Sequence, residues 1–152
     1  MLIHTVLRER ELLHPDVKMG ILLNDCEFSI ESSTEQNRND YLYSAWSKHF
    51  DVFKKSEQKI FIGMQSNLVL GIGTVKELLA GLDKFDIAMY STAGGRFPQV
   101  NDAFFACNRE VIEVVPFIKK QNCPLCAWIL RAKNNGFKIG FVCDKILETR
   151  GK

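Results

Sequence analysis

The chain has 152 residues, of which 46% are hydrophobic, 25% charged and 11% aromatic. This length predicts one domain over residues 1–152, and so much apolar sequence excludes an intrinsically disordered chain. With 20 basic and 18 acidic residues the net charge is +2, which argues against a polybasic nucleic-acid-binding protein.

The apolar runs and the cysteines predict the compartment. No apolar run approaches the roughly 18–20 residues of a membrane-spanning helix. The first residues lack the basic start and the small-residue cleavage site of a secretory signal. The odd number of cysteines favours reduced thiols; they are Cys26, Cys107, Cys123, Cys126 and Cys143. We therefore expect a cytoplasmic protein with no membrane association.

The amino-terminal part predicts strands that alternate with helices. Residues 2–7 are apolar and β-branched and predict a first strand, which a polar stretch over residues 8–18 follows. A solvated loop is expected at residues 32–40, and Asp40 is expected to cap a helix. The apolar stripe of that helix has helical spacing and comprises Leu42, Ala45, Trp46, His49, Phe50 and Phe53. Residues 59–64 predict the second strand.

The middle of the chain predicts a further helix and strand. Thr74 and Glu77 have the spacing of a capping box, so a helix is expected to begin there. Residues 87–90 predict the third strand, and the glycines that follow it allow a sharp turn. Pro98 is expected to open a short helix that reaches Cys107.

The last part of the chain predicts two strands around one helix. Residues 111–115 are strongly β-branched and predict the fourth strand, which Pro116 ends. Asn122 is expected to cap a helix that ends at Gly136, and residues 138–143 predict the final strand. This alternation predicts the α/β class, as a three-layer α/β/α fold with a mixed sheet of about four to five strands.

The sharpest local motif is the pair Cys123 and Cys126, separated by two residues at the start of a predicted helix. A helix N-terminus favours the thiolate form of a cysteine, so the pair is a redox candidate. The chain after the motif is too short for the elements that complete a thioredoxin-type fold. Two small apolar residues in the first turn of a packed helix are the simpler interpretation.

Metal and phosphate motifs are incomplete. A zinc site needs four ligands, typically from two such cysteine pairs, and this chain has one pair. We therefore expect no metal and no cofactor, although a mixed site that uses His4, His14 or His49 stays open. No catalytic triad or paired carboxylates stand out. Gly71 and Gly73 form only half of a phosphate-binding loop.

One segment carries a family resemblance. Residues Asp16 to Gly20 read Asp-Val-Lys-Met-Gly and lie after the first predicted strand. This segment resembles the start of the type 2 peptidyl-tRNA hydrolase family, in which an acidic residue and Lys-Met-Gly follow the first strand. Residues 58–62 and 87–94 are similar to the second and third strands of that family, and residues 74–84 to its next helix. The resemblance covers most of the chain in the right order.

The positions that the family uses for hydrolysis differ in this chain. By resemblance, the family site corresponds to Lys18, Gly20, Asp25, Thr92 and Gly94. Lysines of the family are replaced by Ile21-Leu22-Leu23, and its aspartate is replaced by Thr92. Hydrolysis needs a group that activates water and cations that hold phosphates, so we expect no catalytic residues. Such a pseudoenzyme is similar to bacteriophage-encoded paralogues of the family, which would place it in the host cytoplasm.

Three functions stay open. The favoured one is a non-catalytic peptidyl-tRNA hydrolase type 2-like protein of unknown role that binds a protein or RNA partner. The second is an active peptidyl-tRNA hydrolase with a relocated site that uses Lys18, Thr92 and Asp25. The third is a thiol redox protein that uses Cys123 and Cys126. The sequence names neither the partner nor the oligomeric state.

Overall fold

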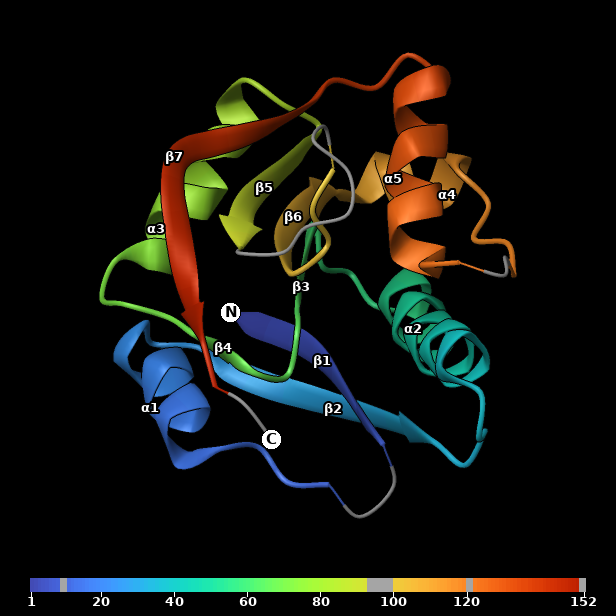
Figure 1. Ribbon diagram of the computed structural model, residues 1–152. Helices are drawn as coiled ribbons and strands as arrows, with labels where there is room; N and C mark the ends of the chain where they lie inside the picture. The colour runs from blue at the N-terminus through green and yellow to red at the C-terminus, as the bar shows by residue number, and fades with distance from the viewer. Residues whose placement is uncertain (9–10, 93–99, 120–121, 151–152) are drawn as a thin grey trace.

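A computed structural model describes residues 1–8, 11–92, 100–119 and 122–150, and these form a mixed α/β fold with a curled sheet of seven strands (Figure 1). The strands are β1 (Leu2–Arg8), β2 (Glu27–Ser33), β3 (Ile60–Met64), β4 (Leu68–Val69), β5 (Ile87–Thr92), β6 (Phe104–Asn108) and β7 (Ile139–Thr149). The helices are α1 (Pro15–Leu23), α2 (Arg38–Lys55), α3 (Thr74–Ala80), α4 (Arg109–Val114) and α5 (Pro124–Asn134), with a 3₁₀ turn η1 (Gly81–Asp83). No helix of the described residues is long and apolar enough to cross a membrane.

The order of the strands is β2-β1-β3-β6-β5-β7-β4. β1 pairs in parallel with both β2 and β3, and β5 pairs in parallel with β7. β6 runs antiparallel between β3 and β5. The chain passes from β1 to β2 through α1 and then returns past β1 to β3 through α2. The direction of winding therefore reverses between β1 and β3, which is a topological switch point.

Hydrophobic side chains cover both faces of the sheet, because successive residues of a strand point to opposite faces. In β3, Phe61 enters a core with α2, α4 and α5, whereas Ile62 enters a core with α1 and α3. We call the first the aromatic core, because the rings of Phe50, Phe61 and Trp128 meet in it. The second, the aliphatic core, is built mainly from Ile, Leu and Val side chains.

Several predicted elements are confirmed, and the sheet is larger than expected. The strand at residues 2–7, the long helix with its apolar stripe and the strands at residues 59–64 and 87–90 are present. The mixed α/β class is correct, but four to five strands is an underestimate, because β2, β4 and β6 were not predicted as strands. β2 is a half-exposed edge strand with few apolar residues, and β4 has only two residues, so neither leaves a strong pattern.

Two predicted elements are of the wrong type. Residues 111–115 belong to helix α4 and its end rather than to a strand, because Val111 and Val115 both face the aromatic core one helical turn apart. In the helix expected up to Cys107, residues 104–107 belong instead to strand β6, and Pro98 lies outside the described residues. β6 is buried on both faces, so its continuous apolar run has no period that distinguishes it from a helix.

The helix starts also differ from prediction. Asn37, not Asp40, caps α2, and its side chain accepts hydrogen bonds from the amides of Asn39 and Asp40. Gly73 in the left-handed conformation precedes α3, so Thr74 is its first residue and forms no capping box with Glu77. The polar stretch at residues 8–18 contains the start of α1, where Pro15 occupies the first turn.

The remaining predictions concern the last helix. Cys123 rather than Asn122 is the N-cap of α5, and it makes no side-chain capping hydrogen bond. The end of α5 is as expected, because Gly136 has a φ of +92° just beyond Asn135. The predicted strand at residues 138–143 continues further than expected, as β7.

Candidate functional site

A polar cavity lies at the carboxyl ends of the parallel strands. It has a volume of about 470 Å³. Gln65 and Asn67 line it just after β3, Thr92 lines it at the end of β5, and Asn101 and Asp102 line it just before β6. Because β6 is antiparallel to β3 and β5, its start lies at the same edge of the sheet as their ends. One edge of the sheet therefore collects five polar side chains, from the ends of β3 and β5 and from the residues just before β6.

A second cavity of about 330 Å³ adjoins the first one. It lies at the switch point, because Val6 of β1 and Gln65 after β3 both line it. Tyr41 and Trp46 of α2 supply aromatic rings to its wall. The residues that line both cavities are Arg38, Leu42, Gln65, Asn67 and Asp102. In open α/β sheets, this position is where ligands bind.

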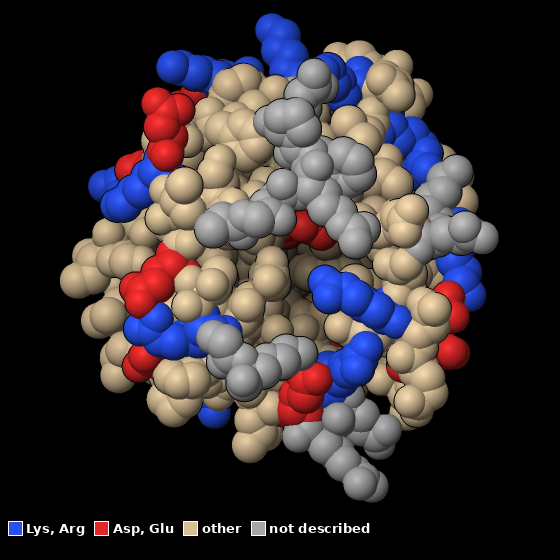
Figure 2. Space-filling view, viewed as in Figure 1, with Lys and Arg blue, Asp and Glu red and all other residues tan. Residues whose placement is uncertain are grey.

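Two helices begin at the larger cavity. Arg38 and Asn39 of the first turn of α2 line it, and so do Cys123 and Cys126 at the start of α5. The N-terminus of a helix carries a partial positive charge and unpaired amide groups, which favour anions. Arg38 is exposed and forms no ion pair with any residue that the structure describes. Lys and Arg side chains border the hollow in this face of the molecule (Figure 2).

A hydrogen-bond network holds the loop before β6. The Asn101 amide nitrogen donates to Thr92 Oγ1 at 3.0 Å, and the Ala103 backbone amide donates to Asn101 Oδ1 at 2.9 Å. Asn101 is only 8% exposed, so these bonds are shielded from water. The network fixes residues 101–103 just before β6, where Asp102 lines the cavity.

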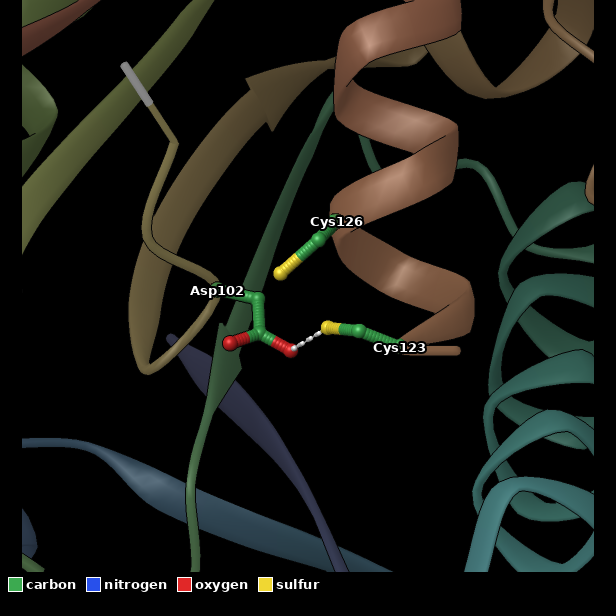
Figure 3. A group of neighbouring side chains, drawn as sticks. All are labelled: Asp102, Cys123 and Cys126. Carbon is green, nitrogen blue, oxygen red and sulfur yellow. Dashed lines mark hydrogen bonds between the residues drawn. The ribbon is translucent and has the colours of Figure 1, made fainter. Parts of the chain in front are cut away.

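Two thiols and one carboxylate meet in the cavity wall (Figure 3). The Cys123 thiol donates to Asp102 Oδ2 at 3.4 Å, and the Cys126 sulfur points toward the same carboxylate. The three donor atoms lie within 4.8 Å of one another. A hydrogen bond with Cys123, burial and the nearby Asp102 charge all raise the pKa of the Cys126 thiol. Both cysteines are free thiols.

The positions assigned by the family resemblance do not gather at one site. Thr92 lines the cavity, whereas Lys18 is exposed on α1 and borders a separate small groove. Asp25 is exposed just after α1, with a φ of +56°. Gly20 permits close packing of α1, because a Cβ there would lie 2.7 Å from the Leu70 carbonyl oxygen. Gly94 lies outside the described residues.

Most residues of the cavity were not identified from the sequence. Arg38 falls in a segment predicted as a loop and Asn101 in one predicted as a helix, and no predicted element covers Gln65 or Asn67. The available signal was the polar residues that immediately follow the end of a buried strand, as Gln65 follows β3. That signal depends on knowing which strands are parallel neighbours, and the local pattern does not give this.

Comparisons with known proteins give likenesses at the level of fold. No family model and no curated protein matches the chain. The structure is similar to glucosyl-3-phosphoglycerate synthase from Mycobacterium tuberculosis in complex with Mg²⁺ and uridine diphosphate, with a TM-score of 0.61 and 12% identity over 99% of this chain and 72% of that one. It is also similar to a protein from STIV, with a TM-score of 0.62 and 10% identity over 94% of this chain and 82% of that one.

A third likeness is to TarS from S. aureus, with a TM-score of 0.63 and 13% identity over 96% of this chain. The chain spans 58% of that TarS chain. These neighbours share a GT-A-like fold with the nucleotide-diphospho-sugar transferases, and the described chain has this fold.

This fold corrects the predicted family and function. The resemblance to type 2 peptidyl-tRNA hydrolases is wrong, because the solved structures that share the fold are glycosyltransferase-like proteins. The predicted non-catalytic hydrolase-like function falls with it, and neither the relocated hydrolase nor the thiol redox protein gains support. The resemblance rested on short motifs in a common strand–helix order, which many α/β folds share.

Proposed function

We propose that the two adjoining cavities bind a nucleoside-diphosphate sugar, the donor of a sugar-transfer reaction. The observation that carries this proposal is the position of both cavities, at the carboxyl ends of the strands and at the switch point. One structural neighbour, glucosyl-3-phosphoglycerate synthase, was solved with uridine diphosphate and also with UDP-glucose. The combined space suits a ligand with a base, two phosphates and a sugar.

Arg38 is the candidate partner of the diphosphate. It lies in the first turn of α2 and lines both cavities, so it stands where the two halves of an extended ligand would meet. A guanidinium forms paired hydrogen bonds with phosphate oxygens, and the dipole of an 18-residue helix adds to the attraction. Arg38 is available for this contact, because it forms no ion pair within the described part of the chain.

The smaller cavity is the candidate site for the nucleoside. Tyr41 and Trp46 provide flat apolar surface, and Gln65 provides an amide that can both donate and accept hydrogen bonds. The Arg8 guanidinium lies 4.6 Å from the centre of the Tyr41 ring and holds that ring from one side. A base would therefore enter beside Tyr41 rather than displace it.

The residues present fit Mg²⁺ or Mn²⁺ poorly, although one neighbour, glucosyl-3-phosphoglycerate synthase, was solved with each of these ions. Asp102 is the only carboxylate among the described residues that line the larger cavity. Mg²⁺ prefers several oxygen ligands, whereas the nearest groups to Asp102 are two thiols. We therefore assign no step of the reaction to Mg²⁺ or Mn²⁺.

Calorimetric titration with nucleoside-diphosphate sugars tests the proposal. UDP-glucose, GDP-mannose and ADP-glucose are titrated into the full chain, with free glucose as the negative ligand. We expect one of the three to bind, and Arg38→Ala to weaken its binding about 10-fold, or about 1.4 kcal/mol. Lys76→Ala is the matched control, because Lys76 is an exposed cation on α3, which packs on the aliphatic core, and it lines neither cavity. Binding of none of the three donors would contradict the proposal.

A further inference from the structure

The cluster of Asp102, Cys123 and Cys126 has the composition of a transition-metal site. Each residue offers one ligand atom, and all three atoms lie within 4.8 Å of one another. Bonds to zinc of about 2.0–2.3 Å place tetrahedral ligand atoms about 3.5 Å apart. The three ligand atoms therefore need to approach one another by only about 1 Å to share one cation.

The fold sets the direction of all three side chains. Cys126 lies in the first turn of α5 and Cys123 is its N-cap, where the left-handed backbone of Cys123 directs its thiol to Asp102 Oδ2. Asp102 comes from the loop before β6, and the Asn101 network to Thr92 and Ala103 fixes that loop. Figure 3 shows both sulfurs directed at the Asp102 carboxylate from the helix side.

The backbone at Cys123 is in an unusual conformation. Its φ of +34° lies in the left-handed region, which a residue with a Cβ adopts at a cost of about 1–2 kcal/mol. Such strain concentrates at functional sites, where the surrounding structure enforces it. Here it accompanies a thiol that is turned onto a carboxylate rather than onto the helix amides, since Cys123 makes no capping hydrogen bond.

The donor chemistry selects the kind of cation. Thiolates bind zinc and related ions, whereas Mg²⁺ and Ca²⁺ are bound by oxygen. Sites in which three protein ligands hold zinc leave a fourth position for water or substrate. All three residues line the larger cavity, so this fourth position would open into it.

We propose that Asp102, Cys123 and Cys126 together bind one thiophilic divalent cation of the zinc class, with one coordination position open to the cavity. This site goes beyond the proposed donor binding and does not depend on it. It also departs from the expectation of no metal, which rested on the two cysteine pairs of a typical zinc site and left open only a mixed site with histidines.

The test uses Co²⁺ as a spectroscopic probe on the full chain, without an affinity tag, reduced and freed of metal. We expect one Co²⁺ per chain, with the thiolate-to-cobalt absorption of a tetrahedral site. Zn²⁺ should displace the Co²⁺, and excess Mg²⁺ should not. No nucleotide is present, so the result is separate from that of the donor titration.

Three variants identify the ligands. Cys123→Ser, Cys126→Ser and Asp102→Asn should each weaken Zn²⁺ binding at least about 100-fold. Cys143→Ser should keep it, because Cys143 packs at the aliphatic core and lies outside the cluster. Cys126 is buried, so circular dichroism checks folding, and the half-buried Cys123 gives a variant that tolerates the change. The wild-type thiols are first shown by titration to be free. If that chain then lacks the cobalt–thiolate absorption, the proposal is overturned. Unchanged Zn²⁺ binding by the folded Cys123→Ser variant would overturn it too.

Discussion

The two ends of helix α2 have different surroundings. Its first turn lies at the carboxyl ends of the parallel strands, here called the carboxyl edge, and its last turn lies at their amino ends, the amino edge. At the carboxyl edge, the first turn of α2 faces the polar cavities with Arg38 exposed. At the amino edge, the last turn of α2 is closed by Arg109, whose guanidinium donates to the carbonyl oxygens of Lys54 at 2.6 Å and Ser56 at 2.8 Å. One arginine ends the helix and stabilises the fold, while the other is left for a ligand. The difference supports the proposal that the carboxyl edge binds a ligand, whereas the contacts at the amino edge stabilise the fold.

The largest expected effect is in the aromatic core, which supports both edges. Trp128 is fully buried, its ring centre lies 5.0 Å from that of Phe50, and its indole nitrogen donates to the Val115 carbonyl oxygen at 3.1 Å. Trp128→Ala should lower the free energy of unfolding by about 3–5 kcal/mol, measured by urea denaturation. Val52→Ala, at an exposed position of α2, should change it by less than about 0.5 kcal/mol. A loss below about 1 kcal/mol for Trp128→Ala would contradict the assigned core.

The next effect concerns a buried pair of histidines, His4 of β1 and His49 of α2. His4 Nδ1 and His49 Nδ1 lie 3.1 Å apart, and His49 Nε2 lies 2.6 Å from the Thr5 carbonyl oxygen. Burial, and then the neighbouring His49, lower the pKa of His4 from 6.5 to about 3. Burial also lowers the pKa of His49. Both rings are therefore neutral in the folded protein at neutral pH.

Stability should therefore fall with acid. The unfolded chain takes up protons on these histidines near pH 6.5, whereas folded His4 resists protonation until about pH 3. The stabilisation is fully present above pH 6.5 and is lost as the pH falls, by about 3 kcal/mol at pH 4. Urea denaturation at several pH values measures this slope. His4→Phe should flatten it and the exposed His14→Gln should not; equal slopes in all three proteins would refute this assignment.

Substitutions of Arg109 test the contacts at the amino edge, where the last turn of α2 ends. Arg109→Ala should lower the free energy of unfolding by about 2 kcal/mol, because charge-assisted bonds to the end of α2 are lost. Arg109→Lys should recover only part of this, since an ammonium group cannot reach several carbonyl oxygens in one plane. The affinity for the nucleoside-diphosphate sugar should stay unchanged in both Arg109 variants. A loss of donor binding without a loss of stability would reverse the roles of the two edges.

The smallest effect on stability is expected at the open edge. Asn101→Ala removes the hydrogen bonds to Thr92 and Ala103 and should cost about 1 kcal/mol. Because the same bonds hold Asp102 in the cavity wall, metal and donor binding should weaken in this variant even while it is folded. Asn135→Ala is the control, since that amide donates to the Arg131 carbonyl oxygen at 2.8 Å, far along α5 from the cavity. Equal affinities of the two variants for the metal and for the nucleoside-diphosphate sugar would show that Asn101 does not support the site.

The sequence predicts elements whose pattern is local. The apolar stripe of α2 and the strands β1, β3 and β5 are confirmed, because the pattern of apolar residues within each segment is enough to predict them. The failures are at positions where tertiary contacts decide. The β-branched residues at 111–115 form a helix because Arg109 anchors its start and the aromatic core receives one of its faces.

The site was less predictable than the fold. Cys123 and Cys126 stand out as a motif, and their role as a redox pair stays a prediction. Their partner Asp102 is distant in sequence and reaches them only through the pairing of β6 between β3 and β5. Strand order is set by non-local contacts, so the sequence pattern could not place Gln65, Thr92 and Asp102 around one cavity.

The position of a bound nucleoside-diphosphate sugar tests the central claim most directly. Amide shifts of the full chain are measured by NMR during titration with the donor that binds. We predict the largest changes at the carboxyl edge, at Gln65, Asn67, Thr92 and Asn101. Changes confined to the amino edge around Arg109, or to α1 and its groove beside Lys18, would contradict the assignment of this cavity as the functional site.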